Sequence, residues 1–338
     1  MKFDVVVGNP PYQETLKDTS DGAIYHHFYN LAEKSGVKYC LISPARFLFN
    51  AGNTDKIWNE HMLSDKHVKV VYYNPEASEV FPHIGFKGGV AVLYRDEEKD
   101  FGAIGVFTAY SELNSIVRKV VNKDNFESII SSIYLQEKFD LEALYRDHNN
   151  LKAKIGSKGK EKRLTTSIFS TVDIFSDVKI SEDDVSILGL IKNKRFYKFI
   201  NRNYLEDHPN LDKWKVILPK SNGSGSLGEV LSSPLVGKPL VGYTQSFISI
   251  GSFDTSTEAE NALKYIKSKF ARTLLGVLKV TQDNNPPTWA KVPLQDFSPE
   301  SDIDWTKSIA EIDRQLYEKY GLSAAEIEFI ETKVKAMN

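Results

Sequence analysis

Several features that would point to particular classes of protein are scarce in this sequence of 338 residues. It has one cysteine, Cys40, which excludes an intrachain disulfide and a cysteine-based metal site. No stretch approaches the ~20 consecutive apolar residues of a membrane span, and no basic region followed by an apolar run opens the chain. We therefore expect a protein of the reducing cytoplasm that does not contact membranes.

An excess of charge of one sign is also lacking. The 43 Lys and Arg residues are balanced by 45 Asp and Glu residues, which gives a net charge of −2. Such a chain has no global attraction to a polyanion, so binding to DNA would require clustered basic residues. The hydrophobic fraction of 41% is that of a globular protein, and the length allows two domains.

The first part of the sequence alternates strands with helices, the pattern of an α/β fold. The run that ends at Gly8 is β-branched without polar alternation, which predicts a strand buried on both faces of a parallel sheet. The expected strands lie at residues 1–8, 37–43, 68–73 and 88–94, and the expected helices lie at 25–34 and 55–63.

Beyond about residue 100 the alternation becomes irregular, which predicts a domain boundary there. We expect one domain over 1–100, a mixed α+β region over 101–300, and C-terminal helices over 301–338. Short strands are expected at 215–218, 240–243 and 247–250, and one long helix at 258–280. Two helices are expected at the end of the chain, over 305–320 and after Ser323, which with Glu326 forms a capping-box pattern.

A loop of four residues directly follows the first strand: Asn9, Pro10, Pro11 and Tyr12. An Asn side-chain oxygen and the next carbonyl can both accept hydrogen bonds from one amino group, while two prolines restrict the backbone. Tyr12 offers an aromatic face to a base, and ligands of open α/β sheets bind outside the carboxyl ends of strands. This combination favours a site that binds an exocyclic amine on a base, although a rigid Pro-Pro turn without function is the alternative.

Together with Phe3-Asp4-Val5-Val6-Val7-Gly8 before it, the loop resembles the catalytic motif of adenine-specific DNA methyltransferases of restriction-modification systems. Further segments resemble later motifs of that family in order: Tyr25-His26-His27-Phe28, Ser43-Pro44-Ala45-Arg46-Phe47-Leu48, Val80-Phe81-Pro82, Phe86-Lys87-Gly88-Gly89-Val90, Leu278-Lys279-Val280-Thr281-Gln282-Asp283 and Val292-Pro293-Leu294. The similarity extends over nearly the whole chain, but only the four-residue loop is specific by itself.

The resemblance implies a partial Rossmann-like methyltransferase sheet, then a mixed α+β DNA target-recognition domain and C-terminal helices. It implies that Asn9 and Pro10 accept from the target amine of a flipped adenine and that Tyr12 stacks on the base. Phe81 or Phe86 would supply the opposite face. In this family the elements that bind S-adenosylmethionine precede the loop. Only eight residues do so here, so we expect the cofactor site to need an upstream segment or a partner methyltransferase or restriction polypeptide.

A glycine-rich segment, Gly223-x-Gly225-x-x-Gly228, has the spacing of a dinucleotide fingerprint but lacks the helix and the acidic residue that should follow. We interpret it as a loop of the recognition region. A permuted methyltransferase, with its cofactor motif after its catalytic loop, is the alternative.

Two basic runs are candidates for contact with double-stranded DNA. Their alternatives are a solvated linker for the first and an amphipathic helix for the second. The scattered histidines do not predict a metal site. The candidate residues are Lys152, Lys154, Lys158, Lys160, Lys162 and Arg163 in the first run, and Lys192, Lys194, Arg195, Lys198 and Arg202 in the second.

Three hypotheses follow for the chain. It is an adenine-N6 DNA methyltransferase component, a DNA-binding specificity module with a vestigial catalytic loop, or a folded remnant with neither activity. Binding of S-adenosylmethionine and methyl transfer to DNA distinguish the first from the others, and the salt dependence of DNA affinity tests the second.

Overall fold

The computed structural model describes residues 2–14, 22–49, 54–82, 88–155, 160–279 and 281–337. The chain divides into two compact units, Met1–Asn114 and Ser115–Asn338. The C-terminal helices that the sequence placed in a region of their own belong to the second unit. Within the described residues, no helix is both long and apolar enough to cross a membrane.

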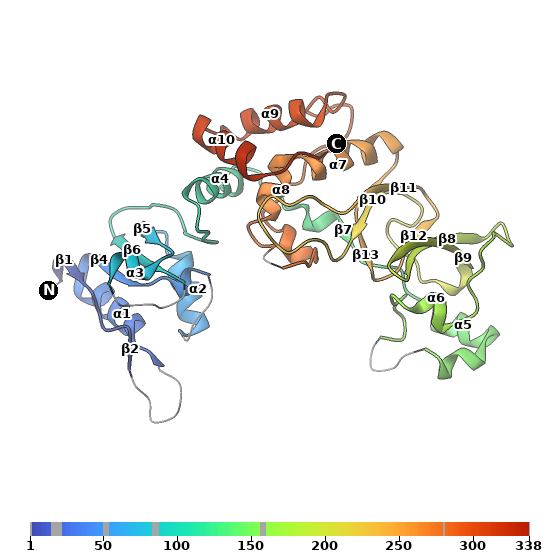
Figure 1. Ribbon diagram of the computed structural model, residues 1–338, viewed down its shortest axis with the longest axis horizontal. Helices are drawn as coiled ribbons and strands as arrows, with labels where there is room; N and C mark the ends of the chain where they lie inside the picture. Colours follow the sequence, from blue (N-terminus) through green and yellow to red (C-terminus); the bar gives the residue numbers. More distant parts are fainter. Residues whose placement is uncertain are drawn as a thin grey trace. The chain divides into compact units, whose positions relative to one another are not determined.

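The first unit is an α/β structure built on a four-stranded sheet of order β1-β4-β6-β5 (Figure 1). β4 is parallel to β1, whereas β6 runs antiparallel to both of its neighbours. The predicted strands and helices of this region are confirmed, with small shifts at their ends. The elements are β1 (Phe3–Gly8), β2 (Gln13–Glu14), β3 (Gly22–Ala23), α1 (Tyr25–Ser35), β4 (Gly36–Pro44), η1 (Arg46–Phe49), α2 (Lys56–Ser64), β5 (Val68–Asn74), α3 (Ala77–Val80) and β6 (Val90–Asp96).

The core of this unit lies between the sheet and helices α1 and α2. Tyr29 of α1 and Phe47 after β4 are almost completely buried, and Trp58 of α2 packs against Phe47 at 5.0 Å between ring centroids. Asp55 begins α2 by accepting hydrogen bonds from the backbone N–H groups of Ile57 and Trp58. These contacts hold the ends of β1 and β4 in place.

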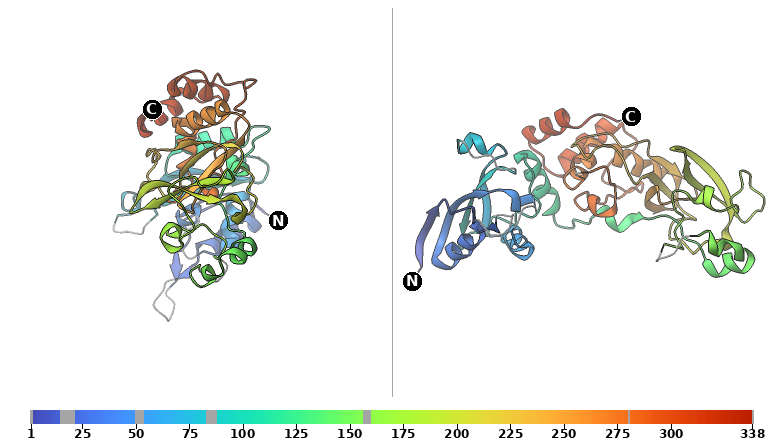
Figure 2. Two further views of the ribbon diagram at one scale, coloured as in Figure 1. Left: turned by 90° about the vertical axis from the view of Figure 1, so that its right-hand side faces the viewer. Right: turned by 60° about the horizontal axis from the view of Figure 1, so that its bottom comes forward.

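The expectation that the first strand is buried on both faces is wrong. β1 is an edge strand, as the right-hand view of Figure 2 shows, and β4 is its partner. Its side chains alternate, so that Phe3 is 70% and Val7 74% exposed. A short apolar run indicates a strand but not how many faces of it are covered, because coverage depends on neighbours elsewhere in the fold.

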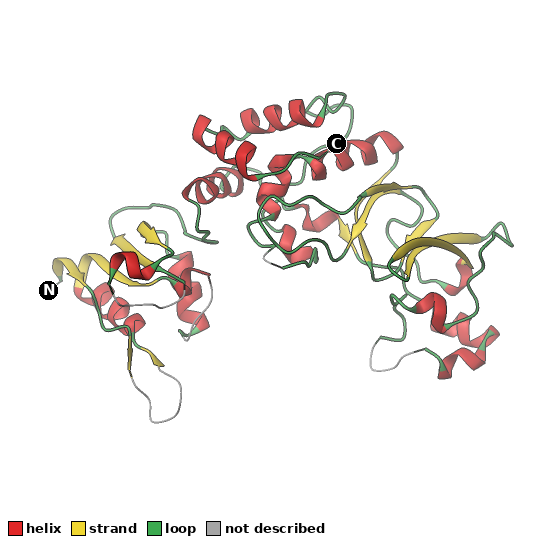
Figure 3. Ribbon diagram, viewed as in Figure 1, coloured by secondary structure: helices red, strands yellow, loops and turns green. Residues whose placement is uncertain are grey.

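The second unit contains two further sheets, of order β11-β10-β13-β7 and β12-β8-β9, and a group of C-terminal helices (Figure 3). Helix α4 (Ser111–Val121) spans the division between the units. The other elements are η2 (Ile129–Ser132), β7 (Ile133–Tyr134), α5 (Leu141–Asp147), η3 (Asn149–Ala153), α6 (Ile168–Thr171), β8 (Asp184–Ile191), β9 (Lys194–Asn201), η4 (Arg202–Tyr204), β10 (Trp214–Pro219), β11 (Leu235–Gly237), β12 (Val241–Tyr243), β13 (Phe247–Phe253), α7 (Ser256–Lys267), α8 (Lys269–Leu275), η5 (Pro286–Trp289), α9 (Ile309–Lys319) and α10 (Ala324–Lys333).

The three short strands predicted in this region are confirmed as β10, β12 and β13, and the capping box of Ser323 and Glu326 begins α10 as expected. The long helix expected over 258–280 is wrong. Ser268 ends α7 and caps α8, because its side chain accepts from the backbone N–H of Ala271. Asp313 of α9 reinforces this break, since it accepts from the backbone N–H groups of Lys269 and Phe270.

The second basic run is not an amphipathic helix either. Lys194 to Asn201 form strand β9, which pairs antiparallel with β8 along its whole length. Lys192 and Asn193 form the two-residue turn of this hairpin, with φ values of 49° and 62°. Such left-handed residues fit the twist of paired strands and end any helical path.

Candidate functional site

The loop Asn9–Tyr12 lies at the carboxyl edge of the first sheet. In the register of β1 with β4, Gly8 pairs with Leu41, and Val90 at the start of β6 pairs with both Pro44 and Asn74. The segments after β1, β4 and β5 therefore meet at the same edge as the glycine pair before β6. This is the edge at which open α/β sheets bind ligands.

The glycine pair closes this edge tightly. Gly88 and Gly89 have φ values of 95° and 76°, which glycine adopts without strain. A Cβ atom on Gly89 would lie 2.2 Å from the backbone oxygen of Asn74. The carbonyl of Gly89 accepts a hydrogen bond of 2.9 Å from the N–H of Ala45, which ties the segment after β4 to the start of β6.

The four loop residues differ in exposure. Asn9 and Pro11 are exposed, Pro10 is buried and Tyr12 is half-buried. The backbone oxygen of Tyr12 accepts a hydrogen bond of 3.2 Å from the N–H of Ile24, just before α1. The loop is thus fixed at both ends, by the β1–β4 pairing and by this bond, while Asn9 is exposed.

Asn9 and Tyr12 also interact with each other. Burial raises the pKa of the Tyr12 phenol, and a side-chain hydrogen bond with Asn9 opposes that shift. The phenol is therefore protonated at neutral pH. Of the two acceptors that the sequence predicted for an amine, the amide oxygen of Asn9 belongs to an exposed residue and the carbonyl of Pro10 to a buried one.

Phe81 lies against Tyr12 in the structure. The ring centroids are 6.3 Å apart and the planes meet at 62°, an edge-to-face contact. Phe81 follows α3, so residues almost seventy positions apart in the chain share this edge. Phe86, the other candidate for base stacking, lies outside the described residues.

A hollow of about 620 Å³ runs along β1 beside the loop. Its lining is mainly apolar and comes from β1, the loop and one side of α1, and it includes Phe3, Val7, Asn9, Pro11, Phe28 and Leu31. Phe3, Val7 and Leu31 are more than half exposed. None of the described strands pairs with the outer edge of β1. The hollow and this edge therefore form one apolar face that the described residues leave uncovered.

The glycine-rich segment of the second unit is occupied by a carboxylate of the chain itself. Glu229 accepts from the backbone N–H groups of Ser224 at 2.8 Å and Gly225 at 2.9 Å, and from the ammonium of Lys279 at 2.6 Å. Burial favours a higher pKa for Glu229, but these partners lower it to about 2. Backbone amides that already hold a carboxylate cannot cradle a phosphate or a cofactor carboxylate, so the geometry favours a structural loop.

The predicted DNA-contacting residues of the first basic run fall in and after η3. Lys154 pairs with Asp173 at 3.4 Å and Lys162 with Glu206 at 2.5 Å. Lys158 lies outside the described residues. The remaining members of this run, Lys152, Lys160 and Arg163, are exposed.

In the second run, Lys198 pairs with Asp177 at 2.7 Å and Arg202 with Asp212 at 2.5 Å. Arg195 lies over the ring of Phe247. Lys192 and Lys194 are exposed at the tip of the hairpin, where no acidic partner lies within ion-pair distance among the described residues.

Sequence reasoning missed a group formed by Glu33, His61 and Asp65, whose ligand-type atoms lie within 4.8 Å of one another. His61 and Asp65 are four residues apart at the end of α2, whereas Glu33 comes from α1, so the sequence alone does not bring the three together. Arg95 approaches Asp65 at 3.2 Å and Glu33 at 3.4 Å, so a guanidinium already neutralises both carboxylates. The arrangement is that of an ion-pair network.

Comparisons with known proteins give a family match in the N-terminal part. Residues 1–81 match the Eco57I restriction-modification methylase family. A stretch of 95 residues is 34% identical to an uncharacterized adenine-specific methylase of Mycoplasma pneumoniae, and covers 27% of this chain and 22% of that protein.

Two solved structures align over 98% of this chain. One is the type IIL restriction-modification enzyme MmeI in complex with DNA, with 9% sequence identity, a TM-score of 0.32 and 56% of that chain covered. The other is the type IIG restriction endonuclease BpuSI, with 11% sequence identity, a TM-score of 0.33 and 53% of that chain covered. The chain spans about half the length of these two proteins. The resemblance stated from the Asn9–Tyr12 loop is thus confirmed by the comparisons, since residues 1–81 match the Eco57I restriction-modification methylase family and the relative is named as an adenine-specific methylase.

Proposed function

We propose that the chain is the base-binding component of an adenine-N6 DNA methyltransferase of a restriction-modification system. One observation carries the proposal: the loop Asn9–Tyr12 stands at the carboxyl edge of the sheet, with Asn9 exposed and Tyr12 in contact with Phe81. The family match over residues 1–81 and the adenine-specific name of the relative support it.

In the proposed reaction, the target adenine leaves the duplex and stacks on Tyr12, a contact worth roughly 1 to 3 kcal/mol. The amide oxygen of Asn9 and the carbonyl of Pro10 accept the two N–H groups of the exocyclic amine. The lone pair of this nitrogen is delocalised into the ring, and two acceptors in this arrangement favour the pyramidal, nucleophilic form. Pro10 and Pro11 hold the acceptors in place because their φ angles cannot relax.

The methyl donor in this family is S-adenosylmethionine, which supplies an electrophilic methyl group. The described residues do not form a complete pocket for it. The segment Gly223-x-Gly225-x-x-Gly228 has the spacing of a dinucleotide fingerprint, but its backbone N–H groups already bind the carboxylate of Glu229. We infer that an upstream segment or a partner polypeptide completes the cofactor site. The uncovered apolar face of β1 supports this inference, since a strand and its side chains added there would bury Phe3 and Val7.

The test combines the chain with the product of the adjacent upstream reading frame, DNA and isotopically labelled S-adenosylmethionine. We expect N6-methyladenine, detected by mass spectrometry of digested DNA, only when both polypeptides are present. Asn9→Ala should abolish the product while DNA affinity stays unchanged. Methylation that survives Asn9→Ala would refute the role of the loop, and tight binding of S-adenosylmethionine to the chain alone, measured by calorimetry, would refute the need for a second component.

A further inference from the structure

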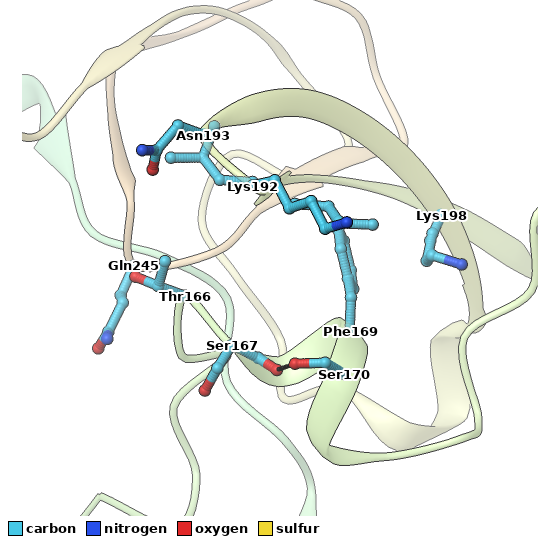
Figure 4. A pocket seen from close by; sticks show the side chains of 10 residues that line it. Thr166, Ser167, Phe169, Ser170, Lys192, Asn193, Lys198 and Gln245 are labelled. Atoms are coloured by element: carbon cyan, nitrogen blue, oxygen red, sulfur yellow. Dashed lines mark hydrogen bonds between the residues drawn. The ribbon is translucent and has the colours of Figure 1, made fainter.

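A groove of about 590 Å³ lies beneath the β8–β9 turn in the second unit. Figure 4 shows Lys192 and Asn193 on one side of it, Ser167 and Ser170 on the opposite side, and Phe169 between them. Gln245 and Thr166 lie toward one end, and Lys198 lies toward the other. None of the residues of the proposed adenine site lines the groove, whereas Lys192 and Lys198 belong to the second basic run that the sequence predicted to contact DNA.

The walls of the groove are held rigidly. The left-handed backbone of Lys192 and Asn193 fixes the turn, and Ile191 pairs with Lys194 directly beside it. Gly189 of β8 allows the ring of Phe169 to lie against the strand, because a Cβ atom on Gly189 would come within 2.3 Å of that ring.

The opposite wall is tied to the same core. The backbone N–H of Gln245 donates to the carbonyl of Leu164 at 2.8 Å, and the hydroxyl of Ser246 lies 3.0 Å from that of Thr166. The hydroxyl of Ser170 donates to the carbonyl of Ser167 at 2.8 Å. A site on such supports is formed before its ligand arrives, which reduces the entropy lost on binding.

The chemistry of the lining selects one class of ligand. None of the ten lining residues is acidic, two are lysines, and Lys192 has no acidic partner among the described residues. The side-chain amides of Asn193 and Gln245 each offer a donor and an acceptor, the pairing that matches the major-groove edge of adenine. Phosphate and base edges occur together in nucleic acid, so one ligand of that class would pair with both the lysine and the amides.

We propose that this groove binds duplex DNA, with Lys192 at a phosphate and the amides of Asn193 and Gln245 reading base edges. The choice of DNA rests on the proposed function, but the site is independent of the adenine loop. Asn193 and Gln245 are therefore residues that determine which sequence is bound.

The experiment selects sequences from a randomised duplex pool with the wild-type chain and with variants, and measures affinity by fluorescence anisotropy. Asn193→Gly removes the amide but keeps the left-handed turn, since glycine adopts that backbone freely. Gln245→Ala removes the second amide. Each variant should lose preference at one or two base positions, by roughly 5- to 150-fold for a lost bidentate contact. Affinity for a duplex lacking the selected sequence should stay unchanged.

Lys192→Asn tests the phosphate contact, because asparagine tolerates the left-handed turn but carries no charge. Affinity should fall about equally on all sequences, and the slope of log affinity against log salt should decrease by about 1. The matched controls are Lys238→Ala and Asn203→Ala, which change exposed residues of the same unit that do not line the groove. Both controls should behave as wild type.

An unchanged selected sequence in both Asn193→Gly and Gln245→Ala would overturn the proposal, as would the absence of DNA binding by the wild-type chain at low salt. Displacement of DNA by polyglutamate as readily as by unlabelled duplex would show a general anion site and would also overturn it. Methyl transfer is measured separately. If the groove variants alter the sequence preference but no combination of the chain with the upstream polypeptide methylates DNA, the groove proposal stands and the catalytic proposal is rejected.

Discussion

The pair of Glu229 and Lys279 should contribute strongly to the stability of the second unit. The Lys279 ammonium is 4% exposed and donates to Glu229, to the carbonyl of Asn222 at 2.8 Å and to that of Thr281 at 3.1 Å. Glu229→Gln keeps the size of the side chain but leaves the buried ammonium without its counter-charge. Loss of one partner of such a pair typically costs 3–5 kcal/mol.

The pKa of Glu229 gives a second measure of how much this ion pair stabilises the fold. Its partners lower the value from 4.5 to about 2 although burial opposes the shift, and a difference of this size corresponds to about 3 kcal/mol. Because the folded-state pKa is depressed, this stability is fully present above pH 4.5 and is lost as pH falls toward 2. By linkage, roughly half of it remains at pH 3.

The assay is urea unfolding of wild type and Glu229→Gln, followed by the fluorescence of tryptophans in the second unit at several pH values. We expect wild type to be more stable by about 3 kcal/mol at pH 7 and by about half of that at pH 3. The control is Glu206→Gln, which breaks the exposed pair with Lys162 and should cost less than about 1 kcal/mol. A Glu229→Gln difference below that of the control, or one independent of pH, would refute the assignment of the glycine-rich segment to a structural loop.

Four further outcomes follow from single contacts. Tyr12→Ala in the reconstituted enzyme should lower methyl transfer by roughly 5- to 150-fold, as expected for one lost stacking contact, whereas Tyr12→Phe should retain most of it; equal losses would point to the hydroxyl instead. Phe81→Ala should have a smaller effect than Tyr12→Ala, because Phe81 supports the Tyr12 ring through one edge-to-face contact. Gly89→Ala should destabilise the first unit by more than about 1 kcal/mol, since a Cβ atom there meets a backbone oxygen at 2.2 Å; thermal unfolding measures this, and an unchanged midpoint would contradict it. Asp313→Ala should cost about 1 kcal/mol, because the first N–H groups of α8 lose their acceptor, and faster amide exchange in α8 is the expected signature.

The sequence predicted the first unit well because its strands and helices carry local signals. The apolar run before Asn9, the helical spacing in α1 and the glycine pair before β6 each determine their own segment. The chemistry of the loop was equally local, since four adjacent residues contain the acceptors and the ring. Phe81 was expected near the loop only through resemblance, as one face for the base, and its edge-to-face contact with Tyr12 was not predicted, because nothing in the intervening residues fixes that distance.

The errors came from features that depend on partners distant in the chain. The exposure of β1 is set by which strands lie beside it, and the break between α7 and α8 is reinforced by Asp313 from another helix. The pairing of Glu229 with Lys279, fifty residues apart, decides what the glycine-rich segment does. One local signal was available for the break: Ser268 is a good N-cap residue inside the predicted helix.

Several residues of the two basic runs already form ion pairs, which reduces the number of cations available to DNA phosphates. Of the eleven basic residues predicted to contact DNA, Lys154, Lys162, Lys198 and Arg202 already pair with acids of the chain. A phosphate that contacts such a residue must displace a carboxylate, so its gain is small. Lys152, Lys160, Arg163, Lys192 and Lys194 have no acidic partner among the described residues. Arg195 has none there either, but it lies over the ring of Phe247 and donates to the carbonyl of Ser232.

Each contact with such an unpaired cation should add about −0.9 to the slope of log affinity against log salt. Contacts by all eleven residues would give a slope near −10, whereas the five unpaired ones give about −4.5 at most. A measured slope steeper than about −6 would mean that DNA opens the ion pairs. A shallower slope agrees with the view that sequence selection by the groove, rather than total charge, determines where this acidic chain binds.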